Sequence, residues 1–250
     1  MAVTPQMFPE GTRRICKSPT HKGAFFMIRS LILLVSCLTI FIQPIAMAAA
    51  NYNDSLKAGD DAMNAGNLDL AMQEFEAAMG HAVAEGEKSF AKAKKAYVLA
   101  FRKKDYAAAR KELEGVVSIN TLSPVAQLTV LQVLAECQMR GDRNFVEAAV
   151  NLEKAAALPN VDFARPYVRL ALADCYRETG DFPKALDTCK AVLETAGIPP
   201  QTQASAHFNM GMTYQYGMKD FENAKKAYAE AVKLNPGLKG EVDSHSSKMP

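Results

Sequence analysis

The stretch KDFENAKKAYAEAVKLNP, residues 219–236, places an acid, an aromatic residue and then an alanine in a fixed order. The same order recurs in GDFPKA from Gly180 and KDYAAA from Lys104, and GNLDLA from Gly66 repeats it with asparagine and leucine in place of the acid and the aromatic residue. Aligned on their alanines, these phrases and a more degenerate one give five anchors: Ala71, Ala109, Ala148, Ala185 and Ala224. The anchor spacings of 38, 39, 37 and 39 residues indicate a stacked array of repeats.

Each repeat contains two amphipathic helical segments joined by a short turn. Before Ala224, residues Gly211 and Tyr214 fall on one helical face, and after it Tyr228 and Ala231 follow at i+4 and i+7. Small residues let two antiparallel helices approach closely, and large ones fill the space beside them. An acid stands at the start of three second helices, where it can cap the free amides: Asp105, Asp181 and Asp220. The fold class predicted from this pattern is all-α.

The motif Met210-Gly211-x-x-Tyr214, followed by Ala224, Tyr228, Ala231 and Pro236, resembles the tetratricopeptide repeat. The resemblance covers Asn53 to Gly237, and the last unit departs from the family pattern by one extra residue in its inter-helix turn. It implies a right-handed α-solenoid of about five repeats, over residues 52–85, 86–122, 124–160, 163–199 and 201–237. The family's usual period is about 34 residues. The period of this chain, 37 to 39 residues, is longer and is similar to that of repeats in exported bacterial envelope proteins. Residues 238–250 are expected to be a disordered tail.

The first fifty residues have the order typical of a secretory signal peptide. A basic lead-in precedes the apolar run Leu31 to Ile42, and small residues follow at Ala46 to Ala50. We therefore expect residues 1–50 to direct export to the periplasm or envelope, with cleavage near Ala48 to Ala50. An uncleaved membrane anchor and lipidation of Cys37 are the disfavoured alternatives, and translation could begin at Met27 instead of Met1.

The sequence predicts no enzyme, no metal site and no cofactor. It contains no phosphate-binding glycine loop and no cluster of histidines and cysteines with metal-ligand spacing. Cys137, Cys175 and Cys189 fall at helical packing positions, which favours buried thiols that act as small apolar fillers. A disulfide between Cys175 and Cys189 is the alternative.

In the tetratricopeptide family the first helices line a concave groove that binds a peptide or a partner helix. The resemblance places the following residues in that groove: Asp60, Lys94, Phe101, Arg102, Gln132, Glu136, Arg140, Tyr167, Asp174, Arg177, Phe208, Met212 and Tyr216. The three arginines either form a ladder for an acidic segment or complement the dipoles of their own helices. The expected function is a protein-interaction scaffold. The alternative is an accessory domain that binds a small ligand, such as a glycan fragment, between Tyr167, Phe208 and Tyr216.

Charge is segregated near the start of the array, although the whole chain carries a net charge of only +2. Residues 51–86 are mainly acidic, and residues 87–111 are rich in lysine and arginine. The two blocks either attract each other, or the basic one receives an acidic partner or the anionic lipids of an envelope membrane. Nucleic acid is a poor choice of partner for an exported protein.

Overall fold

The computed structural model describes residues 51–114, 116 and 119–250. The predicted signal peptide, with its alternatives of anchor and lipidation, lies outside the described residues. The described part is an α-solenoid without strands, as the sequence predicts. None of its helices is both long enough and apolar enough to cross a membrane.

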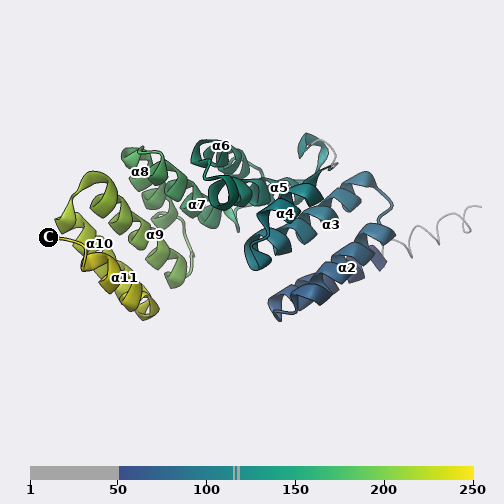
Figure 1. The fold of residues 1–250 in the computed structure, drawn as a ribbon, viewed down its shortest axis with the longest axis horizontal. Coiled ribbons are helices and arrows are strands. Elements are labelled where there is room, and N and C mark those ends of the chain that lie inside the picture. The colour runs from purple at the N-terminus through teal and green to yellow at the C-terminus, as the bar shows by residue number, and fades with distance from the viewer. Residues whose placement is uncertain (1–50, 115, 117–118) are drawn as a thin grey trace, which may run out of the picture. The chain divides into compact units, whose positions relative to one another are not determined.

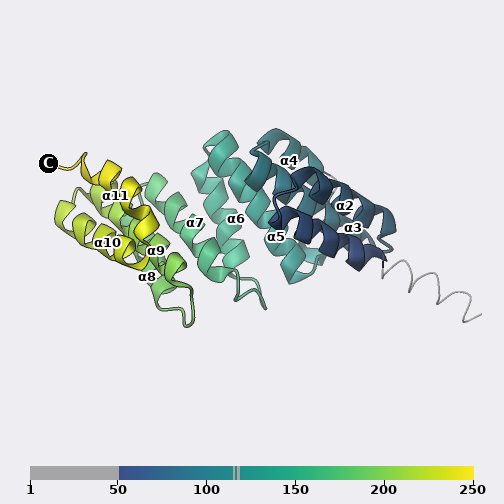
Figure 2. The same cartoon turned by 90° about the horizontal axis from the view of Figure 1, so that it is seen from below.

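Helix pairs succeed one another along residues 51–250 in sequence order, from blue to yellow in Figure 1 and, turned by 90°, in Figure 2. In the first pair, residues 51–64 are helical and precede α2 (Leu68–His81). The second has α3 (Glu85–Tyr97), η1 (Val98–Lys103) and α4 (Tyr106–Leu113), and η2 (Ile119–Thr121) leads onward. The third has α5 (Pro124–Glu136), η3 (Cys137–Asp142) and α6 (Phe145–Ala156). The fourth has α7 (Arg165–Glu178) and α8 (Phe182–Leu193), and the fifth has α9 (Pro200–Met212), η4 (Thr213–Met218) and α10 (Phe221–Leu234).

The five anchor alanines occupy equivalent places in the second helices. Each is fully buried, and its amide donates to the backbone oxygen of the residue that caps the helix. Every cap also accepts, through its side chain, a hydrogen bond from the first turn: Asn67, Asp105, Asn144, Asp181 and Asp220. The capping role that the sequence predicts for the three aspartates is therefore confirmed.

The turn between the paired helices occurs in two forms that differ by one residue. In the first and fourth pairs a glycine with positive φ precedes the cap, as Gly180 does at +85°. There the amide of Asp181 bonds the carbonyl of Tyr176, five residues back. In the other three pairs the first helix ends in the π-helical turns η1, η3 and η4, and the amide of Asp220 reaches six residues back to Tyr214. The wider turn takes up the extra residue that the sequence of the last unit shows.

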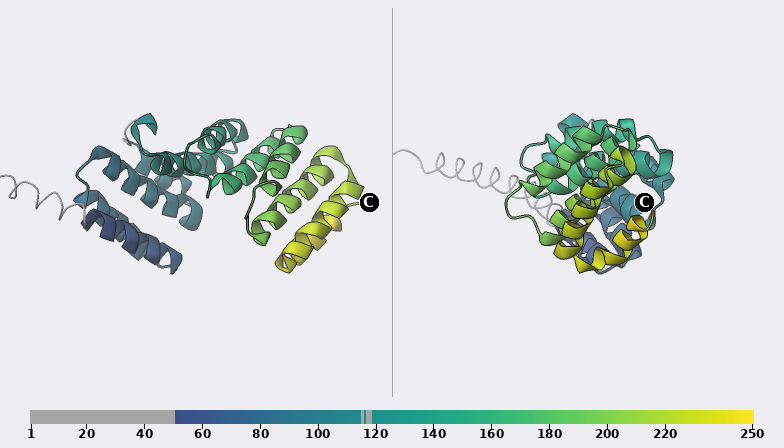
Figure 3. Two further views of the ribbon diagram at one scale, coloured as in Figure 1. Left: turned by 180° about the vertical axis from the view of Figure 1, so that it is seen from behind. Right: turned by 90° about the vertical axis from the view of Figure 1, so that its left-hand side faces the viewer.

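The C-terminal segment corrects the expectation of a disordered tail. After η5 (Pro236–Leu238), helix α11 (Lys239–Ser246) lies beside α10, as Figures 1 and 2 show and as the two further views of Figure 3 confirm. Val242 is buried in a cluster with Ala224 and Tyr228, which partly buried Phe208 and Met212 also contact. The helix is stabilised because it buries apolar surface at the end of the fifth helix pair. The sequence of residues 238–250 alone does not indicate this contact.

The cysteines in the described part of the chain are buried and free. Desolvation raises the pKa of both Cys175 and Cys189 to about 12, so both are neutral thiols at physiological pH. This confirms the prediction that they fill apolar space.

Candidate functional site

An open pocket of about 360 Å³ lies between the second, third and fourth helix pairs. Four of the residues expected in the groove line it: Phe101, Gln132, Glu136 and Tyr167. They come from η1, α5 and α7, all of them in first helices. The sequence register therefore brings part of the predicted site together.

Four aromatic residues contribute to the walls of this pocket. Tyr97 stacks on Phe101 with 4.4 Å between ring centroids, and burial raises the pKa of the Tyr97 phenol. Phe163 and Tyr167 also line it, and they keep 67% and 52% of their surface exposed. Exposed aromatic residues around a concave surface are typical of a binding site, because they gain contact area only when a partner covers them.

Sequence reasoning missed several lining residues of the aromatic pocket. Tyr97 precedes Phe101 by four residues and so shares its helical face, a signal that could have been read. Phe163 belongs to the connection before α7, where no helical register applies. Met139 lies in the π-helical turn η3, which shifts the register of its helix by part of a turn.

Two other predicted groove residues pair with each other. The Nζ atom of Lys94 donates to both carboxylate oxygens of Asp60, at 2.9 and 3.0 Å. The charge blocks meet again where Lys95 pairs with Glu76 and Lys103 with Asp69. Within the described residues, these contacts support the interpretation that the acidic and basic blocks attract each other.

The three arginines of the predicted ladder have different surroundings. Arg177 donates to Asp174 and Glu178 of its own helix, while its buried Nε atom has no partner among the described residues. Burial raises the pKa of Asp174, and the charge of Arg177 opposes that rise. Arg102 and Arg140 are exposed and form no ion pair within the described part of the chain. All three lie in the last turns of first helices, as the dipole interpretation requires.

A second hollow, of about 490 Å³, brings Arg177, Met212 and Tyr216 together with His245 from α11. The phenol oxygen of Tyr216 lies 2.8 Å from His245 Nδ1. Phe208 contacts the same imidazole, with 5.6 Å between ring centroids. Tyr216 and Tyr167 therefore line separate hollows, and Phe208 lines neither of these two.

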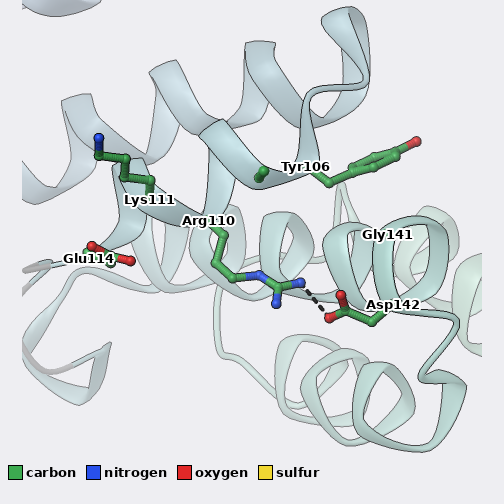
Figure 4. Close-up of a pocket in the computed structure, with 7 residues that line it drawn as sticks. Tyr106, Arg110, Lys111, Glu114, Gly141 and Asp142 are labelled. Carbon is green, nitrogen blue, oxygen red and sulfur yellow. Dashed lines mark hydrogen bonds and ion pairs between the residues drawn. The ribbon is translucent and has the colours of Figure 1, made fainter.

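A third hollow lies against α4, the second helix of the second pair, and is drawn in Figure 4. Arg110 faces Asp142 across it and forms an ion pair, while the ring of Tyr106 points away from that pair. Two of its four charged residues thus satisfy each other, and its one aromatic residue is Tyr106, which makes it a weaker candidate than the pocket at Phe101 and Tyr167. No group of histidine, cysteine and acidic residues in the described part of the chain could hold a metal ion.

Comparison with known proteins agrees with this geometry. Residues 204–238 match the family model of the tetratricopeptide repeat. A search of curated protein sequences finds no match. The structure is similar to that of YrrB, a TPR protein with an unusual peptide-binding site, with a TM-score of 0.54 and 20% identity over 78% of this chain and 90% of YrrB. It is also similar to the MamA protein, with a TM-score of 0.53 and 18% identity over 77% of this chain and 96% of MamA. The last repeat, residues 204–238, therefore matches the tetratricopeptide-repeat family, and the described part of the chain has the fold of a tetratricopeptide-repeat array.

Proposed function

We propose that the protein is an interaction scaffold whose first helices bind an extended segment of a partner protein. The observation that carries the proposal is the pocket lined by the aromatic residues Tyr97, Phe101, Phe163 and Tyr167, called the aromatic pocket here. Its lining residues come from three successive repeats. A pocket of this volume accommodates one large side chain of a bound segment. The likeness to YrrB, which binds a peptide, supports the same interpretation.

Polar contacts beside the pocket would fix the orientation of the bound segment. Arg102 and Arg140 directly follow the lining residues Phe101 and Met139, and both are exposed. Acidic residues next to the anchored side chain of the partner can pair with them. Such exposed pairs are weak singly and are screened by salt, so the side chain anchored in the pocket supplies most of the affinity.

Selection from a displayed library of random peptides tests the proposed function. We expect selected peptides to bind Tyr167→Ala and Phe163→Ala about tenfold or more weakly than the parent protein, because an aromatic contact residue is lost. Both side chains are mostly exposed, so neither change should unfold the array. Val146→Ala is the matched control, since Val146 is exposed to the same extent as Phe163 but lies on the second helix α6. The proposal would be contradicted if the selected peptides bound both variants as tightly as the parent protein. It would also be contradicted if the protein bound saccharides but no peptide.

We further propose that the protein is exported through residues 27–50. The support is the order of basic residues, apolar run and small residues in that segment. A reporter fused behind residues 27–50 should cross the inner membrane and have its new N-terminus near Ala49 or Asn51. Retention of the reporter in the cytoplasm would contradict export, and an intact N-terminus would mean that the segment is an anchor.

A further inference from the structure

The aromatic pocket contains a carboxylate that lacks a hydrogen-bond partner within the described structure. The side chain of Glu136 is only 9% exposed and lines the pocket among Tyr97, Phe101 and Tyr167. The nearest cation is Lys104, whose Nζ atom lies 3.8 Å from Glu136 Oε1, beyond hydrogen-bond distance. Asp60, an acid on the first helix of the first repeat, is by contrast bonded through both oxygens to Lys94.

A buried carboxylate without a hydrogen bond is costly in an apolar site, because an ion pair at 3.8 Å with Lys104 replaces its lost hydration only in part. An apolar side chain in the pocket would remove the remaining water from Glu136 and increase this cost. An acidic side chain would add repulsion between like charges. A cationic side chain offers the missing charge-assisted hydrogen bond, which is stronger than a neutral one.

The pocket walls favour the same class of side chain. Lysine and arginine have long apolar stems that pack along aromatic rings, and their charged heads are attracted to ring faces. The stacked Tyr97 and Phe101, together with Tyr167, offer such rings around Glu136. The side-chain amide of Gln132 adds a second acceptor beside the carboxylate. We propose that the aromatic pocket binds a basic side chain, lysine or arginine, of the partner segment, with its charged head at Glu136.

Lys104 does not preclude this occupant. Its side chain is 59% exposed, and at 3.8 Å it forms no hydrogen bond that the incoming group must break. Its charge is therefore largely screened by water, as are the exposed charges of Arg102 and Arg140. These rim cations would instead pair with acids that flank the basic anchor.

The inference rests on the proposed function, and synthetic versions of the selected peptides test it separately. Each basic residue of a pocket-dependent peptide is replaced in turn by norleucine, and affinities are measured by fluorescence polarisation on the parent protein and on Glu136→Gln. We expect one replacement to weaken binding to the parent about tenfold or more. The same replacement should change binding to Glu136→Gln less than about twofold, since the carboxylate that it served is gone. Glu114→Gln, which removes an acid from the separate hollow at α4, should behave as the parent does.

A second measurement requires no selected peptide. Met139 lines the pocket, so its 13C-labelled methyl group, identified with Met139→Leu, reports on occupancy. N-acetyl-arginine amide and N-acetyl-lysine amide should shift this signal saturably, N-acetyl-norleucine amide should not, and Glu136→Gln should abolish the shift. Pocket-dependent peptides with apolar or acidic anchors, indifferent to Glu136→Gln, would overturn the inference and leave the proposed function intact. The absence of any pocket-dependent peptide would overturn the proposed function, and the methyl shifts would then decide the inference alone.

Discussion

At the scale of single residues, the packing inside a repeat depends on pairs in which a glycine of one helix contacts a large aromatic ring of the other helix. A Cβ atom built on Gly211 would lie 2.5 Å from two ring atoms of Tyr228, and one on Gly59 would meet Phe75 equally closely. Both pairs join the first helix of a repeat to its second helix. These are the small and large positions that the sequence pattern predicts, so the packing inside a repeat was readable from residue types alone.

Gly211→Ala should therefore destabilise the protein, although alanine is the better helix former. The added methyl group must displace the ring of Tyr228, and overpacking of this kind costs about 1–3 kcal/mol. Gly80→Ala is the matched control, because a Cβ there meets nothing within 4 Å and should gain up to about 1 kcal/mol of helix stability. Chemical denaturation of both variants measures the two changes. Equal melting of Gly211→Ala and the parent would contradict the close approach.

At the scale of elements, the sequence predicts what repeats and misses what occurs once. The anchors, caps and turns recur five times, and their alignment fixes the register of α2, α4, α6, α8 and α10. The aromatic pocket was predicted only in part, because Phe163 lies in a connection that no repeat pattern governs. Helix α11 was missed because it is short and polar, and helices of this length form only through tertiary contacts.

His245 makes several of the contacts that α11 forms with the fifth repeat. Its ring touches Phe208, Tyr216 and Tyr228, and its backbone oxygen accepts a hydrogen bond from Gln215 Nε2 at 2.8 Å. Gln215 in turn accepts from the phenol of buried Tyr228. His245 thereby joins the helix to η4 and α10, in addition to the buried contact of Val242 with α10.

Docking of α11 should weaken in acid. Burial lowers the pKa of His245, Lys248 and Arg177 lower it further, and Glu241 opposes them. The neutral imidazole is thus favoured in the docked state, so its contribution is complete above the ordinary pKa of about 6.5. That contribution is lost as the pH falls from there through the lowered pKa. Hydrogen exchange of the α11 amides, corrected for intrinsic rates, should show less protection at about pH 5 than at about pH 7.5.

His245→Asn should remove most of this difference between the two pH values, because asparagine does not titrate. The readout must be local, since burial also lowers the pKa of His207 in α9. Equal protection of the parent α11 at both pH values would show that His245 does not control docking.

At the scale of the whole molecule, stability is distributed along a line. Buried clusters join neighbouring repeats, as where Leu152 of α6 packs with Val168 and Cys175 of α7. Ion pairs such as Lys94 with Asp60 add to the junction of the first two repeats, each worth about 1 kcal/mol or less. Because each repeat contacts mainly its neighbours, damage at one position should stay local, unlike in a globular domain with one core.

Ala185→Leu tests this locality. Ala185 is a fully buried anchor of α8, so the larger side chain should force the fourth helix pair apart and cost about 1–3 kcal/mol. Amide protection should fall in α7, α8 and the adjoining helices, while α2, two repeats away from the nearest affected pair, keeps the protection of the parent. Ala77→Leu, at an exposed site on α2, serves as the control for the side chain itself. Uniform loss of protection from α2 to α10 would mean that the array unfolds as a single cooperative unit, and unchanged melting would mean that Ala185 does not lie at the close contact between its two helices.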